Sequence, residues 1–220
     1  MSGGYCIFGK IAVPVADIAR TRPNWREVNS AIETIKIGLI MRRSRTQRLL
    51  VVSDIHGFPG TFAELFGVGC LEHRGLQLAG LSGRPDLSGD SLHDHLFSKD
   101  GVQQAVRELL EIDGRTCVGI GFSAGGTALW TAVKQGLELE ALICVSSTRL
   151  RFETSPLNMP NMVFWGEADP YRPSESWNDT LPVYWKTYPG KPHDFYRIDA
   201  ATPNSPLRTD IAAFIQSLSV

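Results

Sequence analysis

The sequence lacks the features that point to membranes or nucleic acids. None of its apolar runs reaches the roughly 18 residues that a membrane-spanning helix requires. Its 22 lysine and arginine residues nearly balance its 23 aspartate and glutamate residues, and the formal net charge is −1. A chain without an excess of positive charge has no general attraction to nucleic acid or to an anionic membrane surface. We therefore expect neither as a partner.

The sequence is also poor in cysteine, and its cysteines are not spaced as metal ligands or redox pairs. The four residues are Cys6, Cys70, Cys117 and Cys144, and no two of them form a C-x-x-C motif. The last two lie inside apolar runs, where cysteine behaves as a small hydrophobic residue. This usage favours a reduced, cytoplasmic setting without a zinc site.

Signals for secretion and for metal binding are missing as well. Residues 1–14 lack the basic start and the clean apolar segment of a signal peptide, so none is predicted. His93 and His95 flank Asp94, which could suggest metal ligands, but no third ligand follows at a suitable spacing. We predict no metal site and no cofactor, and we interpret these histidines, together with His73, as surface or loop residues.

The length and composition favour a single domain. A chain of 220 residues, with 43% hydrophobic and 20% charged residues, can bury a sizeable core but is short for two domains. We therefore predict one α/β domain over residues 1–220, in which residues 1–30 are the least readable part. Residues 11–15 contain a proline, which favours an edge strand.

Apolar runs alternate with amphipathic segments along the rest of the chain. Runs typical of strands cover residues 34–41, 48–53, 75–81, 117–122, 141–146, 162–166 and 183–188. Helical patterns cover residues 61–66, 100–112, 127–134 and 206–218. Residues 82–99 show turn residues without periodicity and are predicted to form a loop at the functional face. Strands alternating with helices predict a mostly parallel, doubly wound sheet with helices on its faces.

One motif stands out, Gly121-Phe122-Ser123-Ala124-Gly125. It matches the G-x-S-x-G nucleophile elbow, a sharp turn between a strand and a helix. About 0.07 chance matches are expected in a chain of this length at ordinary glycine and serine frequencies. We interpret Ser123 as a nucleophile and the N–H of Ala124, at the start of the following helix, as one oxyanion donor.

A serine nucleophile needs a base and a group that orients the base. In hydrolases with this elbow the chain order is serine, then an acid, then histidine. His193 is the only histidine after Ser123, and it follows the last predicted strand. Two carboxylates follow the penultimate strand. We predict that Asp169 orients His193, because the proline after it favours a fixed turn, and keep Glu167 as the alternative.

The second oxyanion donor is expected from the loop after the strand at residues 48–53. His56-Gly57-Phe58 resembles the His-Gly-aromatic pattern found there, which favours the N–H of Phe58. Ile55 is the alternative if the loop has a different register. We interpret His56 itself as a residue that shapes the loop.

Three segments together resemble the α/β-hydrolase superfamily, and within it the dienelactone hydrolase family most closely. They are Gly-Phe-Ser-Ala-Gly-Gly (121–126), Trp-Gly-Glu-Ala-Asp-Pro (165–170) and Tyr-Pro-Gly-Lys-Pro-His-Asp-Phe-Tyr-Arg (188–197). The founding enzymes have cysteine where Ser123 stands, and a glutamate on the early loop where this chain places Asp54. These departures concern the substrate rather than the ester-hydrolysing apparatus.

The resemblance also implies a residue that binds a substrate carboxylate. Arg197 stands where the family places an arginine with that role. The alternative is a surface arginine that pairs with Asp194 or Asp199. Arg84, in the loop after residue 81, is a second and weaker candidate.

The segment 148–160 has room only for a loop, so no separate lid domain is expected. A shallow pocket covered by loops favours small, soluble esters as the partner molecules. The leading hypothesis is a serine esterase or lactonase. The alternatives are a thioesterase or acyltransferase with the same residues, and a non-catalytic ligand-binding module on the same fold. The sequence carries no signal for an oligomeric state.

Overall fold

The computed structural model describes residues 5–8, 11–14, 48–60, 72–115 and 117–218, and the statements below concern these residues. The chain divides into two compact units, Met1–Arg45 with Ala213–Val220, and Thr46–Ala212. In the first unit, β1 (Tyr5–Phe8) pairs antiparallel with β2 (Ile11–Pro14). The strand predicted near residues 11–15 therefore exists, but its partner is β1. The strand predicted at 34–41 and the helix predicted at 61–66 lie outside the described residues.

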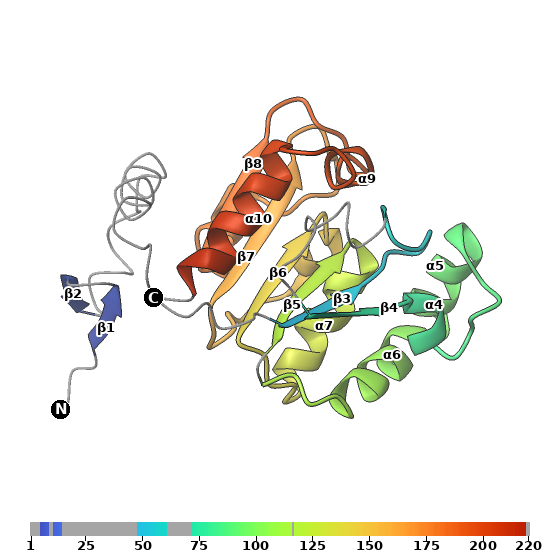
Figure 1. Cartoon of the computed structure of the whole chain (residues 1–220). Helices are drawn as coiled ribbons and strands as arrows, with labels where there is room; N and C mark the ends of the chain where they lie inside the picture. The colour runs from blue at the N-terminus through green and yellow to red at the C-terminus, as the bar shows by residue number, and fades with distance from the viewer. Residues whose placement is uncertain (1–4, 9–10, 15–47, 61–71, 116, 219–220) are drawn as a thin grey trace. The chain divides into compact units, whose positions relative to one another are not determined.

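The second unit contains a six-stranded sheet in which every neighbouring pair is parallel. The strand order is β4-β3-β5-β6-β7-β8 (Figure 1). The strands are β3 (Arg48–Val52), β4 (Glu72–Leu76), β5 (Cys117–Phe122), β6 (Ala141–Val145), β7 (Asn161–Gly166) and β8 (Tyr184–Tyr188). All residues of β5, β6 and β7 are buried, which explains their continuous apolar sequences.

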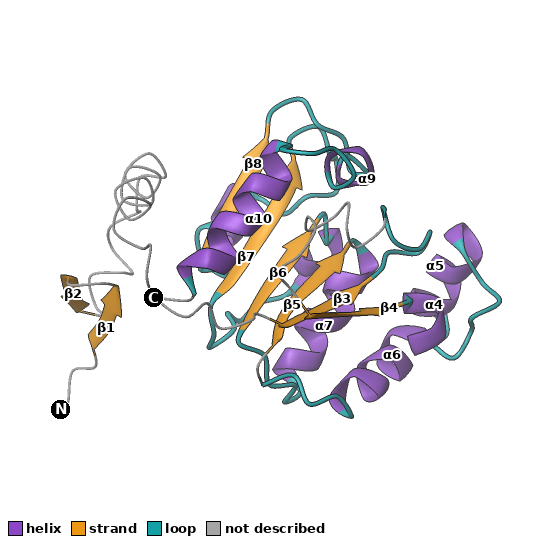
Figure 2. Ribbon diagram, in the orientation of Figure 1, coloured by secondary structure: helices purple, strands orange, loops and turns teal. Residues whose placement is uncertain are grey.

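Helices cover both faces of this sheet (Figure 2). Helix α7 packs against β5 and β6, and α10 lies on the opposite face, in front of β7 and β8. The helical segments are α4 (Leu78–Leu81), α5 (Gly89–Ser98), α6 (Gly101–Leu110), α7 (Ala124–Lys134), the 3₁₀ turn η1 (Thr148–Phe152), α8 (Glu175–Asn178), α9 (Tyr196–Asp199) and α10 (Pro206–Ser217). The predicted doubly wound α/β class is confirmed. No helix among the described residues is long and apolar enough to cross a membrane.

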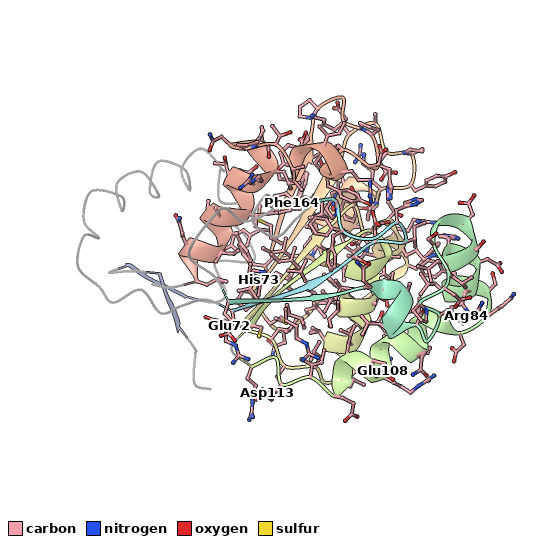
Figure 3. The ribbon with its side chains drawn as sticks, turned by 45° about the vertical axis from the view of Figure 1, so that its right-hand side comes forward. Glu72, His73, Arg84, Glu108, Asp113 and Phe164 are labelled. Carbon is pink, nitrogen blue, oxygen red and sulfur yellow. The ribbon has the colours of Figure 1, made fainter. Side chains whose placement is uncertain are left out.

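The strand predicted at residues 75–81 is wrong in its position. The actual strand, β4, begins at Glu72 and ends at Leu76, and α4 follows at once. Strand β4 lies at the edge of the sheet and its first four residues are exposed, so it carries polar side chains where a central strand would be apolar. Glu72 and His73 lie at its start (Figure 3).

The loop predicted at residues 82–99 is wrong over its second half, which forms α5. Only Leu92 and Leu96 of this helix are buried. They are four residues apart, so they lie on one side of the helix. Leu92, Leu96 and Phe97 are a weak helical pattern in ten residues, and apart from Gly89 the remaining residues are polar.

Helix α7 approaches the strands more closely than any side chain would allow. A Cβ atom on Gly125 would lie 2.2 Å from the backbone oxygen of Ser53, and one on Gly121 would lie 2.3 Å from Cα of Gly126. A Cβ atom on Gly126 would lie 2.0 Å from Oγ of Ser147. Three glycines therefore let the start of α7 contact the backbones of β3 and β5 directly.

Gly125→Ala is expected to lower the free energy of unfolding by about 3 kcal/mol or more, because the atom it meets is backbone oxygen that cannot rotate away. Urea denaturation followed by circular dichroism measures the change. Gly80→Ala is the matched control, since a Cβ atom there has no neighbour within 4 Å. Equal stabilities of the two variants would contradict the close approach.

Candidate active site

Ser123 occupies the turn between β5 and α7. Its backbone has φ 48° and ψ −117°, a region that residues other than glycine rarely adopt. Such a conformation costs about 1–3 kcal/mol and persists where the surroundings enforce it. The N–H of Ser123 donates to the carbonyl of Val145 on the neighbouring strand at 2.7 Å, which anchors the turn. Ala124 is the first residue of α7, so its N–H has no acceptor within the helix.

Ser123, His193 and Asp169 form one chain of hydrogen-bonding contacts. Oγ of Ser123 lies 3.1 Å from Nε2 of His193, and Nδ1 of His193 lies 2.6 Å from Oδ2 of Asp169. The other carboxylate oxygen of Asp169 accepts the N–H of Tyr171 at 2.9 Å. The Asp169 side chain is fully buried, whereas that of His193 is 36% exposed. The imidazole therefore has solvent on one side and a fixed carboxylate on the other.

The loops that carry Asp169 and His193 are joined through their backbones. The N–H of Ala168 donates to the carbonyl of Lys191 at 2.9 Å, and that of Glu167 donates to Tyr188 at 3.0 Å. These hydrogen bonds join Glu167 to backbone groups and not to His193. Its carboxylate instead accepts the N–H of Gly190 at 2.8 Å. Glu167, the alternative to Asp169, therefore binds the backbone of the loop that carries His193.

The topology brings a second loop to the same place. Strands β3 and β5 are neighbours, but their onward connections lead to β4 on one side and β6 on the other. Ligands of open α/β sheets bind at such a point, beyond the carboxyl ends of the strands. Val52 pairs with Gly121, so Asp54 and Ser123 stand at the same level, two residues beyond that pair.

Comparison with solved structures finds similar architectures at low sequence identity. A protein of Pectobacterium atrosepticum assigned as a YdeN-like hydrolase matches with a TM-score of 0.50 and 17% identity, over 87% of this chain and 98% of the other. The α/β hydrolase MGS-MChE2, from a metagenome of lagoon sediments at Mar Chica in Morocco, matches with a TM-score of 0.50 and 13% identity, over 82% and 99%. The chain has the α/β-hydrolase fold. A Klebsiella pneumoniae protein assigned as a dienelactone hydrolase is also similar, with a TM-score of 0.48 and 17% identity over 80% and 90%. No protein-family model matches the sequence, and the search of curated proteins finds no match.

In this α/β-hydrolase fold, the loop after β3 turns back on itself. The N–H of Gly57 donates to the carbonyl of Asp54 at 3.3 Å, and that of His56 donates to the Asp54 carboxylate at 2.6 Å. Gly57 has φ 89°, which suits glycine. Asp54 and Gly57 form an antiparallel bridge, so Ile55 lies within the turn and Phe58 follows it. The Ile55 N–H has no acceptor among the described residues.

Asp54 is a buried carboxylate that binds the segment after His193. It is 1% exposed and accepts hydrogen bonds from the Tyr196 hydroxyl at 2.7 Å and from the Arg197 guanidinium at 2.5 Å. Burial and the nearby charge of Asp54 raise the pKa of Tyr196 far above its ordinary value, so the hydroxyl stays protonated and donates. Burial lowers the pKa of Arg197, but the bond to Asp54 and its charge outweigh this effect and raise it.

The alternative partners named for Arg197 are therefore wrong, whereas its binding of a substrate carboxylate stays a prediction. It pairs with Asp54 rather than with Asp194 or Asp199, and Asp199 instead binds Lys191 at 2.9 Å. Because Asp54 and Arg197 are 143 residues apart in the sequence, no local sequence pattern could indicate this ion pair. Arg84, the second candidate, is exposed and pairs with Asp86 at 2.7 Å. It projects from the connection between α4 and α5 (Figure 3).

A depression of about 330 Å³ lies beside the β3 loop. Asp54, Ile55 and His56 line one side, and Ser88 and Leu92 line another. The N–H of Gly89 donates to the carbonyl of Ile55 at 2.8 Å, which attaches the start of α5 to this loop. Leu92 of α5 and residues of α4 also line this depression, and Ser123 and His193 do not.

The histidines on α5 have structural contacts. Nε2 of His95 lies 3.0 Å from the carbonyl of Ser82, and the ring of His93 lies 4.9 Å from that of Phe97. His93 and His95 are two residues apart in a helix, so they point in different directions. Among the described residues, no group of three or more histidine, cysteine, aspartate or glutamate side chains could hold a metal ion.

Arg197→Ala is expected to lower the free energy of unfolding by about 2–4 kcal/mol, because it leaves the buried Asp54 carboxylate without its cation. The double variant Asp54→Asn with Arg197→Ala should recover part of this loss, since the buried charge is then removed as well. Urea denaturation measures both. Arg84→Ala, which breaks an exposed pair, should cause no measurable change. If Arg197→Ala lowers the free energy of unfolding equally in the wild-type and the Asp54→Asn background, the ion pair is not the cause of the loss.

Proposed function

We propose that this chain is a serine hydrolase that cleaves small carboxylic esters or lactones through an acyl-enzyme on Ser123. The contact chain from Ser123 through His193 to the buried Asp169 carries this proposal. His193 takes the proton of the serine hydroxyl as Oγ attacks the acyl carbon, and then gives it to the leaving group. Asp169 orients the imidazole and stabilises its charged form. Water, activated by the same histidine, releases the acid.

The oxyanion that forms during attack is held by backbone donors. The Ala124 N–H, at the start of α7, is one of them, and the positive end of the helix dipole supports it. Phe58 is the second donor proposed from the sequence, and Ile55 is the alternative. Ile55 is favoured by its N–H, which has no acceptor among the described residues.

The expected substrate is a small molecule. The described segment between β6 and β7 contains only η1 and a loop, so no lid domain is inserted there. We also propose a cytoplasmic, reducing setting, which agrees with the buried and unpaired thiols of Cys117 and Cys144.

Labelling by a fluorophosphonate probe tests the proposal, since only an activated serine reacts. Wild type should be labelled and Ser123→Ala should not, and hydrolysis of small esters should fall on the order of 10⁴–10⁶-fold. Ser146→Ala is the matched control. This buried serine ends the neighbouring strand with a similar φ of 51°, and its hydroxyl has no partner among the described residues. Absence of labelling in wild type would favour a non-catalytic ligand-binding module.

The two carboxylates after β7 should differ sharply in their effect on catalysis. Asp169→Asn should lower kcat by about 10⁴-fold, because an amide cannot stabilise the imidazolium in the correct tautomer. Glu167→Gln should stay within a few-fold of wild type, since its amide oxygen can still accept the N–H of Gly190. Steady-state kinetics on a 4-nitrophenyl ester measures both variants. The reverse ranking would assign the acid role to Glu167.

A further inference from the structure

Arg149 differs from the two arginines that the sequence suggested as anion receptors. Arg197 and Arg84 are each paired with a carboxylate. Arg149, in η1, is half-buried and has no ion pair or hydrogen bond to any residue in the described ranges 48–60, 72–115 and 117–218. Partial burial and then the like charge of Arg151 lower the pKa of Arg149. No carboxylate of the described residues opposes these two effects.

The Arg149 side chain is held by an aromatic ring and not by an acid. Its Cζ atom lies 3.7 Å from the centre of the Phe97 ring of α5. Stacking occupies one face of the planar guanidinium and leaves its N–H edge available, which is the edge that binds carboxylate or phosphate in a bidentate manner. Arg151 is fixed nearby, because it donates to the carbonyl of Thr148 at 2.9 Å. Two positive charges therefore lie close together without a bound acid among the described residues.

This arginine lies on the functional edge of the sheet. Val145, whose carbonyl accepts the N–H of Ser123, precedes Arg149 by four residues, which span at most about 14 Å. On the other side, α5 begins at Gly89, whose N–H is bonded to Ile55. Phe97 lies eight residues along that helix, or about 12 Å away. Both paths place Arg149 at the carboxyl edge of the sheet, after the strand next to β5.

We propose that Arg149, assisted by Arg151, binds an anionic group of the substrate, a carboxylate or a phosphate, that is separated from the scissile ester by an extended linker. The proposal rests on the proposed function of Ser123 and narrows its substrates to acidic, elongated molecules.

The first experiment compares 4-nitrophenyl monoesters of four-, six-, eight- and ten-carbon dicarboxylic acids with their neutral methyl-capped counterparts. In wild type, the preference for the acidic form should rise with length and be largest for the eight- and ten-carbon esters. Arg149→Gln should raise KM for these two esters by about tenfold, with kcat and the neutral esters nearly unchanged. Arg115→Gln is the matched control, because it removes the same charge from an exposed arginine before the start of β5.

A second arm distinguishes the two sources of the anion. Octanoyl-coenzyme A carries phosphates on the leaving group, and octanoyl-N-acetylcysteamine is its uncharged counterpart. A rise in KM with Arg149→Gln confined to the coenzyme A thioester would place the anion on the leaving group. A rise confined to the dicarboxylate esters would place it on the acyl chain. Equal changes for charged and neutral substrates in both series would overturn the proposal and leave Arg149 as a stacking partner of Phe97.

A binding measurement separates this proposal from the proposed function. Calorimetry with suberate and with inorganic phosphate uses the Ser123→Ala chain, in which no turnover occurs. At least one anion should bind, and Arg149→Gln in the same background should abolish that binding while Arg115→Gln retains it. If wild type is neither labelled by the fluorophosphonate nor active on any ester, the hydrolase proposal fails, and the calorimetry still decides whether Arg149 binds anions. Absence of binding, or equal binding to the Arg149→Gln chain, would contradict the anion site.

Discussion

Direct backbone contact between α7 and the strands beside it is the constraint on which the candidate site depends. With no side chain at Gly121, Gly125 or Gly126, the helix begins one residue after β5 ends, and Ser123 has to bridge the two in a strained conformation. The strain directs the serine out of the sheet, while the helix start supplies an N–H beside it. The position of β3 matters equally, because the carbonyl of Ser53 lies against Gly125 and so fixes the loop of Asp54 relative to the nucleophile.

The charges near this edge follow one rule. Each buried acid is matched locally, Asp169 by an imidazole and a backbone N–H, and Asp54 by a guanidinium, a phenol and a backbone N–H. Leaving either of them unmatched would cost several kcal/mol. Within the part of the chain that the structure describes, the half-buried guanidinium of Arg149 contacts an aromatic ring and no acid. The buried acids Asp54 and Asp169 have partners, whereas the cation Arg149 has no acid beside it among the described residues. This edge is therefore suited to bind an anion.

Most of the sheet could be predicted from local sequence, and the proximity of Ser123, Asp169 and His193 could be predicted because each follows a strand of one parallel sheet. Continuous apolar runs report strands buried on two faces, and the elbow motif reports the turn that follows one of them. Strand β4 and helix α5 were mispredicted since an edge strand and a surface helix have few apolar positions. The partner of Arg197 could not be predicted, because Asp54 lies on a different part of the chain. Arg149 had no sequence signal, since what distinguishes it is that no acid among the described residues pairs with it.

The long-range bonds around Asp54 also have a consequence for the order in which the molecule assembles. Asp54 and Arg197 are 143 residues apart, and Ser123 and His193 are 70 apart. Contacts between such distant positions carry a large loop-closure entropy and form after local structure. During synthesis, the nucleophile and its helix leave the ribosome well before the base does. Any hydrolytic activity would therefore appear only when the last strand docks. In an incomplete chain, Ser123 would lack His193 and Asp54 would lack Arg197.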